Sequence, residues 1–355
     1  MEQRILRTMQ RTTIKDIAAA AGVSHTTVSY VLNKNPNQKI SDKTRKKVLE
    51  AAKKLNYIPN ENARSLRNDS THCITVALEK SITHSRFSGI LQGIREELGA
   101  EGYGLLLTGF QTRDNMKHPY YLDSVLQRRA DGIIYVSSDG LSPSCSKDIE
   151  DYNLPFVACD CCPDEEGLAS VSFDYEKGAF EVACRLFGEG TRRILYWQPD
   201  APTFQESYRI TGLENAMKLY PGTSIEVCKM PCLSDHSISN DRYPLIDDVC
   251  RQSLVQNVMP HLISFEESDA VICSWGVMVK HLCAALYQRQ SKQMKIALLS
   301  DADIPVIPNI RILTSRPGFI RGGRESAKLL LSQLRGEDVN LRVVLDPDPP
   351  IYVEL

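Results

Sequence analysis

The sequence has no long apolar run. No stretch of it approaches the roughly 20 consecutive apolar residues that cross a bilayer as a helix. Residues 1–11 are polar and basic, without the apolar middle part of a secretory signal peptide. We therefore expect neither a membrane span nor export, and a protein that stays in the cytoplasm.

The short motifs of several enzyme classes are also absent. The chain contains no Walker phosphate loop, no Gly-x-Ser-x-Gly elbow, no His-Glu-x-x-His motif and no Gly-x-Gly-x-x-Gly dinucleotide loop. Its scattered acidic residues form no recognisable catalytic set. The sequence thus predicts a protein that is not an enzyme, with no catalytic residues and no cofactor.

Cysteine is missing from the first 72 residues, and all 11 cysteines follow. An odd number without the spacing of a disulfide framework suits a reducing compartment, where most cysteines serve as small buried apolar residues. Cys159, Cys161 and Cys162 lie close together, but they follow an apolar run and lack a spaced second pair. We therefore expect no metal site.

Charge divides the chain more clearly than composition does. At 355 residues we expect two or three domains. Residues 1–70 hold 14 of the 42 Lys and Arg and 6 of the 44 Asp and Glu, which leaves 28 and 38 for residues 71–355. A compact basic segment attracts nucleic acid, because binding releases condensed counterions. The alternative, a solvated basic tail, conflicts with the helical pattern of this segment.

The basic segment begins with signals for two short helices. Thr13 and Asp16 form a Thr-x-x-Asp capping box, and Gly22 is suited to a left-handed turn at the end of that helix. Ser24 is a good N-cap for a second helix over His25–Leu32. A third helix is expected from 41 to 56, so that three helices share one small core.

The spacing Ala-x-x-Ala-Gly-Val-Ser at 18–24 fits a helix-turn-helix, with small residues where the helices cross and a glycine in the turn. The blocks 13–18, 21–29 and 55–60 resemble the DNA-binding head of the LacI/GalR repressor family. The resemblance covers about the first 68 residues. It implies that the second helix reads operator DNA.

By this resemblance, His25, Thr26 and Tyr30 occupy base-reading positions, while the hydroxyls of Ser24, Thr27 and Ser29 bind phosphates. The alternatives are that His25 is merely solvated and that Tyr30 packs on the third helix. We favour DNA contact, because an exposed face on such a helix has few other tasks. The expected DNA-binding residues are Thr13, Ser24, His25, Thr26, Thr27, Ser29, Tyr30, Asn33, Tyr57, Asn60, Ala63, Arg64 and Leu66.

Residues 60–68 resemble the hinge of the same family, including Ala-Arg-Ser-Leu at 63–66. A segment this short and polar is not a stable helix by itself, so we expect it to fold on DNA. Two such hinges side by side can enter the minor groove and insert Leu66 between base pairs. The alternative is an ordinary linker with one incidental leucine.

From residue 72 onward, apolar strands alternate with amphipathic helices, which predicts parallel doubly wound sheets. In a first lobe we expect strands at 74–78, 103–107, 132–136 and 155–159, with helices at 87–98, 120–129 and 147–152. In a second lobe we expect strands at 193–197, 225–230, 270–273, 295–299 and 311–314, with helices near 211–219, 244–259, 277–289 and 323–334.

This body resembles the periplasmic-binding-protein type I core of the same family, more weakly than the head does. The predicted fold class is an all-α helix-turn-helix head plus an α/β two-lobed core. The predicted domains are 12–58 for the head, 59–71 for the hinge and linker, and 72–355 for an effector-binding and dimerisation core of two interleaved lobes.

The resemblance places an effector between the lobes. In Tyr208-Arg209-x-x-Gly212 the arginine inherits the effector-binding role, against the alternative of a surface ion pair. We expect Phe87, Asp160 and Asp301 to lie at strand ends that face the effector, as parallel sheets bind ligands at that edge. Trp275 either stacks on the ligand or only fills the lobe interface. Gly276 departs from the family, in which sugar-responsive members carry an aspartate that chelates hydroxyls.

The sequence as a whole predicts a transcription repressor that binds DNA as a homodimer on a roughly palindromic site, under control of a small-molecule effector whose sugar-like character is left open. The chain ends without the heptad helix of tetrameric relatives, so no tetramer is expected. One alternative is a non-specific architectural DNA-binding protein, and another is a solute-binding module without regulatory output.

Overall fold

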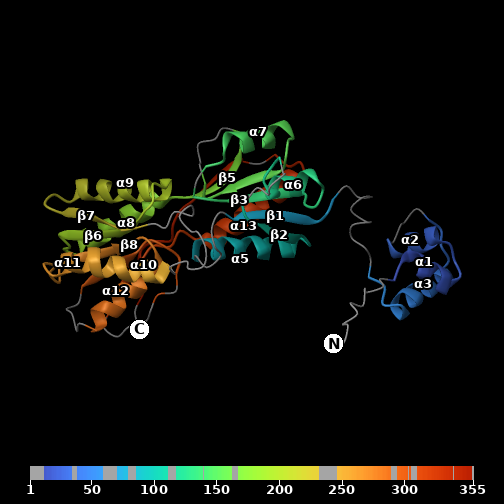
Figure 1. Ribbon diagram of the computed structural model, residues 1–355, viewed down its shortest axis with the longest axis horizontal. Coiled ribbons are helices and arrows are strands. Elements are labelled where there is room, and N and C mark those ends of the chain that lie inside the picture. The colour runs from blue at the N-terminus through green and yellow to red at the C-terminus, as the bar shows by residue number, and fades with distance from the viewer. Residues whose placement is uncertain are drawn as a thin grey trace, which may run out of the picture. The chain divides into compact units, whose positions relative to one another are not determined.

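The computed structural model forms two compact units, residues 1–69 and residues 70–355 (Figure 1). Each unit is described by itself. The structure describes residues 12–33, 38–58, 70–78, 85–110, 117–138, 140–161, 167–231, 246–288, 294–302, 304, 310–338 and 340–353.

The described residues of the first unit form three helices, α1 (Ile14–Ala21), α2 (His25–Leu32) and α3 (Asp42–Lys54). The predicted capping box is present, because the Thr13 side chain accepts from the Asp16 N–H while the Asp16 carboxylate accepts from the Thr13 N–H. Gly22 ends α1 in the left-handed conformation at φ 66°, where a β-carbon would be strained. The ends of all three helices therefore lie within two residues of the positions that the local sequence signals predict.

A small apolar core holds the three helices together. Its buried members are Ile17, Ala18, Val28, Val31, Val48, Ala51 and Ala52, whereas Leu49 of α3 is exposed. The Thr12 hydroxyl donates to the Leu55 carbonyl at 2.9 Å and ties the start of the unit to the end of α3. This core leaves the opposite side of α2 available to solvent.

Lobe one of the second unit is a six-stranded sheet with helices on both faces (Figure 1). The strand order is β11-β5-β4-β3-β1-β2, and all neighbours pair in parallel. The strands are β1 (Cys73–Leu78), β2 (Gly104–Thr108), β3 (Gly132–Val136), β4 (Phe156–Cys159), β5 (Ala169–Phe173) and β11 (Arg342–Leu345). The helices are α5 (Ser85–Ala100), α6 (Tyr120–Leu126), α7 (Pro143–Asp151) and α13 (Phe319–Leu334).

Lobe two is a second six-stranded sheet in the order β12-β10-β9-β8-β6-β7, parallel except for β12. Its strands are β6 (Arg193–Asp200), β7 (Ser224–Pro231), β8 (Ala270–Cys273), β9 (Lys295–Leu298), β10 (Ile312–Thr314) and β12 (Ile351–Val353). One face is covered by α8 (Tyr175–Gly188) and α9 (Phe204–Leu219). The other face is covered by α10 (Ile246–Ser253), a π-helical turn at Leu254–Val258, α11 (Met259–Leu262) and α12 (Gly276–Gln288).

The chain crosses between the lobes three times, after β5, after β10 and after β11. The crossing segments hydrogen-bond to one another: the Asp174 N–H donates to the Leu345 carbonyl at 3.0 Å, and the Asp348 N–H donates to the Arg316 carbonyl at 2.8 Å. Three crossing segments, linked by hydrogen bonds, restrict how the lobes can move. Opening and closing about this junction is the motion that such connections leave available.

The chain alternates between the lobes, since β11 follows the lobe-two strand β10 but pairs in lobe one, and the lobe expected for one helix was wrong. The helix expected at 323–334 belongs to lobe one rather than lobe two, because the chain returns to lobe one after β10 and α13 packs along α5. Two glycines permit this contact. A β-carbon on Gly323 would lie 2.0 Å from the Ile90 carbonyl oxygen, and one on Gly93 would lie 2.0 Å from the Ile320 carbonyl oxygen. The backbones of α5 and α13 therefore touch directly.

Beyond shifts of a few residues at helix ends and the division of the helix expected at 244–259, five elements differ from the sequence expectation. The strands β5, β11 and β12 and the helix α8 were not predicted, and α9 begins at Phe204 rather than near 211. The strands β11 and β12 lie at sheet edges, with exposed and half-buried residues in place of a buried apolar run. The first two turns of α9 were missed because Gln205, Glu206 and Arg209 occupy its buried face, where the helical pattern requires apolar residues.

Candidate DNA-binding and effector-binding sites

The first turn of α2 presents its backbone to solvent in the arrangement that binds phosphate. The Ser24 hydroxyl accepts from the Thr27 N–H at 3.1 Å and lies 2.9 Å from the Thr27 hydroxyl. Unpaired N–H groups and the positive end of the helix dipole make such a turn attractive to anions. The predicted phosphate-binding positions therefore lie where a phosphate is favoured.

The predicted base readers differ in exposure. His25 and Thr26 are exposed on α2, and Tyr30 is half-buried, in keeping with partial packing beside the small core. Asn33 is exposed, and its amide donates to the Ser29 carbonyl at 2.8 Å. His25 and Thr26 are thus the members of this group that are fully presented to a partner.

Two further predicted DNA contacts have structural tasks. The Thr13 side chain belongs to the capping box of α1, and Tyr57 packs partly against the core of the first unit. The hinge positions Asn60, Ala63, Arg64 and Leu66 lie outside the described residues. Their DNA-binding roles stay predictions.

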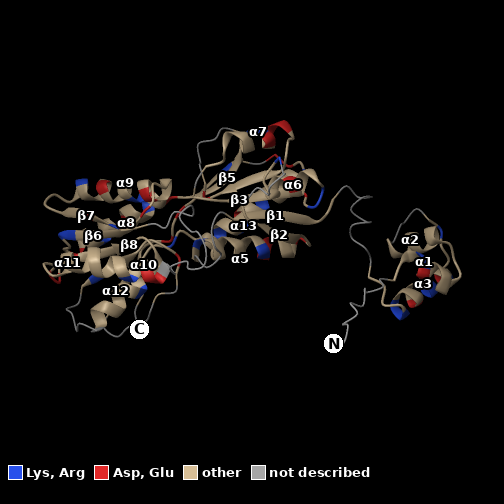
Figure 2. Ribbon diagram, viewed as in Figure 1, with Lys and Arg blue, Asp and Glu red and all other residues tan. Residues whose placement is uncertain are grey.

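Positive charge in the first unit is concentrated on α3 rather than on α2. Figure 2 shows basic residues on α3, whereas α2 has no Lys or Arg in its sequence HTTVSYVL. The basic residues of α3 are Lys43, Arg45, Lys46, Lys47, Lys53 and Lys54. A neutral helix with hydroxyls and one imidazole discriminates bases by hydrogen bonding, while the lysines of a neighbouring helix supply charge without sequence preference.

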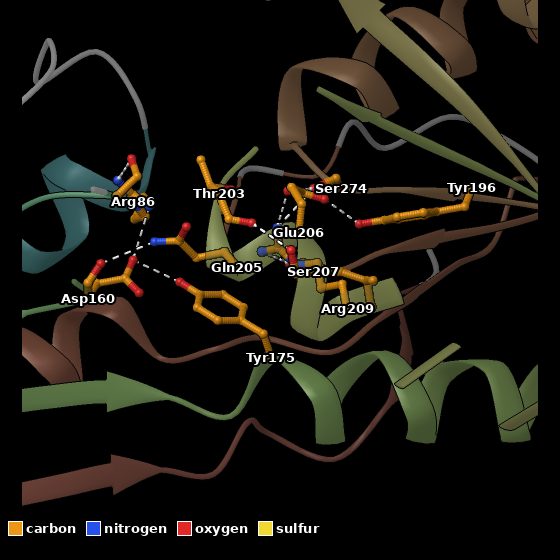
Figure 3. A network of polar contacts seen from close by, with 12 residues as sticks. Arg86, Asp160, Tyr175, Tyr196, Thr203, Gln205, Glu206, Ser207, Arg209 and Ser274 are labelled. Atoms are coloured by element: carbon orange, nitrogen blue, oxygen red, sulfur yellow. Dashed lines mark hydrogen bonds and ion pairs between the residues drawn. The ribbon is translucent and has the colours of Figure 1, made fainter. Parts of the chain in front are cut away.

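Arg209 lies in the second turn of α9, where it belongs to a buried polar network (Figure 3). Its Nη1 donates to the Glu206 carboxylate at 2.5 Å and to the Ser274 hydroxyl at 2.9 Å, and its Nη2 donates to the Leu299 carbonyl at 3.1 Å. Burial is the largest single influence and lowers the pKa of Arg209, but Glu206, Tyr196, Tyr175 and Asp160 together outweigh it and raise that pKa above its usual value. The alternative of a surface ion pair is wrong, because both partners are only 4% exposed.

Gly212 explains how Arg209 reaches this place. A β-carbon on Gly212 would lie 2.1 Å from the Glu176 carbonyl oxygen, so glycine lets α9 approach the backbone of α8. One turn earlier, the Arg209 guanidinium then lies 4.6 Å above the Tyr175 ring at the start of α8. The Arg-x-x-Gly spacing thus positions the arginine through a helix contact.

Asp160 supplies the lobe-one side of the network. It follows β4 in the left-handed conformation at φ 55°, which is uncommon outside glycine and less rare for Asp and Asn. Its side chain is fully buried, and Oδ2 accepts from the Tyr175 hydroxyl at 2.9 Å and pairs with the Arg86 guanidinium at 3.2 Å. Burial raises the pKa of Asp160, while Arg86 and Tyr175 act in the opposite direction.

Gln205 and Tyr175 join the two lobes. The Gln205 amide donates from α9 to the Asp160 backbone carbonyl at 3.1 Å, and the Tyr175 hydroxyl reaches the Asp160 side chain. Burial and the Asp160 charge raise the pKa of Tyr175, so its hydroxyl stays protonated and donates. In Figure 3 these side chains point toward one another from α5, α8, α9 and the end of β4. We call this set, with Arg86, Glu206, Arg209 and Ser274, the lobe-junction network.

Three buried polar atoms of the lobe-junction network have no hydrogen-bond partner among the described residues: Asp160 Oδ1, Gln205 Oε1 and Arg209 Nε. Buried polar groups are almost always paired, and each unpaired one costs about 1–3 kcal/mol. Two of these atoms are acceptors and one is a donor. Atoms of this kind are candidates for pairing with a polar ligand at the junction.

Of the other predicted effector contacts, Asp301 follows β9 as expected, but its carboxylate accepts from the backbone N–H of Phe319 at 2.7 Å and of Gly318 at 3.4 Å. Phe87 does not lie at a strand end. It lies in the first turn of α5 and is buried in the lobe-one core. Trp275 follows β8, partly buried against the lobe-two core. Their contacts with an effector stay predictions.

Gly276 stands where sugar-responsive relatives carry an aspartate, and in this structure there is no room for a side chain at that position. A β-carbon at this position would lie 2.2 Å from the Ala302 β-carbon, so no side chain fits. An acid is nevertheless present nearby, because Glu206 of α9 binds the hydroxyl of Ser274, two residues before the glycine. Sequence reasoning missed Glu206. The available signal was a polar half of an otherwise apolar buried helix stripe, at 205, 206 and 209 ahead of 212, 213 and 216.

Cys159 and Cys161 are buried, and Cys162 lies outside the described residues. Within the described ranges, no three His, Cys, Asp or Glu side chains are grouped to hold a metal ion. The helices among these residues include none with the length and apolar character of a membrane span.

A helix-turn-helix unit joined to a two-lobed α/β core with a shared polar network defines a ligand-responsive DNA-binding regulator. Residues 13–60 match the family model described as bacterial regulatory proteins, lacI family. Residues 71–249 match periplasmic binding proteins and sugar binding domain of LacI family. The chain belongs to the LacI family: it is a DNA-binding transcriptional repressor regulated by effector binding in its core domain, and not an enzyme.

Two curated relatives illustrate the match. The HTH-type transcriptional repressor PurR of Photobacterium profundum is 33% identical over 342 residues, which cover 93% of this chain and 94% of that protein. The probable HTH-type transcriptional repressor ExuR of Bacillus subtilis is 36% identical over 185 residues, about half of either protein (51% and 53%). Among solved structures, the lac repressor dimer bound to operator and the anti-inducer ONPF superposes with a TM-score of 0.76 at 20% identity, covering 96% of this chain and 98% of the other. That likeness confirms the fold.

Proposed function

We propose that this repressor acts in the cytoplasm as a homodimer on a roughly palindromic operator, with its effector bound at the lobe-junction network. The observation that carries the effector site is the set of three unpaired buried atoms, Asp160 Oδ1, Gln205 Oε1 and Arg209 Nε. A ligand that pairs them contacts both lobes at once. It therefore stabilises one closure state over the other, which links effector affinity to operator affinity.

The dimer and the palindrome follow from the size of the reading helix. One eight-residue helix contacts too few base pairs for specificity, so two copies are needed, and two-fold symmetry is then mirrored in the half-sites. The related lac repressor structure is of a dimer on its operator, which supports the same arrangement here. His25, Thr26 and Tyr30 would read bases, Ser24, Thr27 and Ser29 would bind phosphates, and Leu66 of each hinge would insert at the centre.

The operator arm of the test begins with selection of bound sequences from random DNA by the full-length protein. We expect inverted half-sites, a dimer-sized complex in sedimentation, and a steep loss of affinity when the site is scrambled. Exchanging His25 and Thr26 should change the preferred half-site. Leu66→Ala should weaken operator binding more than binding to random DNA, because only an easily kinked central step repays the insertion.

Equal losses on operator and random DNA would exclude the insertion role of Leu66. A monomer that binds one half-site with full affinity would exclude the dimer. Equal affinity for selected and scrambled DNA would instead support an architectural DNA-binding protein. Tight ligand binding without any change in operator affinity would support a solute-binding module.

A further inference from the structure

Glu206 differs from the other groups of the lobe-junction network because it binds the proposed effector-binding arginine from within the same helix. Its Oε1 accepts from Arg209 and from the Ser274 hydroxyl at 2.6 Å, and its Oε2 accepts from the Tyr196 hydroxyl at 2.6 Å. Three buried partners hold the carboxylate in place. A ligand carboxylate that sought Arg209 would have to displace Glu206 and leave a buried charge unpaired.

The charges of the network cancel. Arg86 pairs with Asp160 and Arg209 pairs with Glu206, so two positive and two negative side chains meet at the junction. An uncharged ligand keeps this balance, whereas an anion brings a net negative charge into a region where Asp160, Glu206 and Arg209 are at most 4% exposed. Burial makes such an uncompensated charge costly.

The hydrogen-bonding capacity left over favours donors on the ligand. Asp160 Oδ1 and Gln205 Oε1 are unpaired acceptors, while Arg209 Nε is the single unpaired donor among the described residues of the network. The Gln205 amide nitrogen already donates to the Asp160 carbonyl, which fixes the oxygen as its free end. Neighbouring hydroxyl groups supply two donors and one acceptor at short spacing, and a carboxylate supplies acceptors alone.

We propose that Glu206 is a charge-selecting residue that occupies Arg209 and excludes anionic effectors, so that the effector is uncharged and rich in hydroxyl groups. This inference rests on the proposed effector site and adds the chemical class of its ligand. Glu206 is not a residue that composition or motif spacing had marked, and it supplies an acid in a site whose strand-end position, Gly276, admits no side chain.

The experiment uses matched ligands that differ only at C6: glucose and glucuronate, galactose and galacturonate, mannose and mannuronate. Calorimetric titration of the full-length protein at neutral pH gives the affinity ratio within each pair. We expect wild type to bind at least one hexose about tenfold or more tightly than its uronate. Glu206→Gln retains a hydrogen-bond acceptor but frees the Arg209 charge, so it should shift that ratio about tenfold or more toward the uronate.

Glu214→Gln is the matched control, because Glu214 is an exposed residue of the same helix α9. It should leave every ratio at the wild-type value. A wild-type preference for any uronate, a ratio unchanged by Glu206→Gln, or no binding to any of the six compounds would overturn the inference.

The double variant Glu206→Gln/Arg209→Met distinguishes this failure from failure of the proposed site. It removes both charges together and should bind neither member of a pair. If it binds a hexose as wild type does, the ligand lies elsewhere and the effector site itself is wrong. If binding is lost while wild type prefers a uronate, the site stands and only the charge selection by Glu206 is rejected.

Discussion

Arg209 is predicted to stabilise lobe two only while Glu206 is present. The two side chains are each 4% exposed and joined by a 2.5 Å contact, so Arg209→Met leaves a buried carboxylate without its counter-charge. Removing one partner of a buried ion pair costs about 3–5 kcal/mol, whereas removing both is often nearly neutral. Methionine keeps an unbranched side chain but loses the guanidinium that lies over the Tyr175 ring, so the comparison with the double variant, which loses the same contact, isolates the charge.

The chain offers a local probe for this measurement. Its two tryptophans, Trp197 and Trp275, both lie in lobe two, and Trp197 is fully buried. Urea unfolding followed by tryptophan fluorescence therefore reports on the lobe that holds the pair. With a urea dependence of about 3 kcal/mol per molar, the midpoint of Arg209→Met should fall by about 1–2 M. Glu206→Gln/Arg209→Met should recover most of that loss, since the introduced glutamine side chain still accepts from Tyr196 or Ser274.

A double-mutant cycle gives the coupling between the two residues. We expect a coupling free energy of at least about 2 kcal/mol. Additive losses, with the double variant destabilised by the sum of the single variants, would refute the argument that charge balance holds this network together. That outcome would also weaken the case for charge selection by Glu206.

Three further predictions concern other parts of the chain. Ser24→Ala and Ser41→Ala each remove a helix N-cap and should each lower the stability of the first unit by about 1 kcal/mol in thermal unfolding. Only Ser24→Ala should also weaken DNA binding. Equal DNA affinities of the two variants would exclude a phosphate contact at Ser24. Burial raises the pKa of Asp160 in the folded protein, so between its usual value of 3.8 and the raised value the folded state binds more protons than the unfolded state. The free energy of unfolding should therefore fall as pH rises through that window. Asp160→Asn should flatten this dependence of stability on pH in melting curves from about pH 4 to 8, and the same dependence in both proteins would contradict the prediction. Gly323→Ala should destabilise lobe one by about 3 kcal/mol or more, because its β-carbon meets the Ile90 carbonyl at 2.0 Å. The control Gly99→Ala has open space on α5 and should be neutral or stabilising. Comparable losses in both variants would contradict the argument that the α5–α13 contact requires glycine at 323.

Much of the first unit could be predicted from the sequence because its instructions are local. The capping box at Thr13, the left-handed Gly22 and the caps Ser24 and Ser41 each act within four residues, so helix boundaries follow from neighbours along the chain. The central strands of the two lobes could also be predicted, because their burial is visible in the sequence. Central strands such as β3 and β8 are buried on both faces, which makes each a continuous apolar run.

The lobe-junction network depended on tertiary structure instead. Asp160 and Arg209 could be marked as candidates, but Gln205 and Tyr175 are brought to Asp160, and Tyr175 to Arg209, by the close approach of α8 and α9 at Gly212 and by the crossing after β5. The one local sign that Glu206 faces inward is its spacing from the small and apolar residues at 212, 213 and 216. Its burial is tolerated only because Arg209, Tyr196 and Ser274 converge on it, and polar residues on a buried helix face erase the periodicity that would have revealed the helix. The sequence by itself thus determined the class of protein and the form of its DNA-binding head, while the burial of the charged groups and the Arg86–Asp160 pair at the effector site were decided by contacts between residues far apart in the chain.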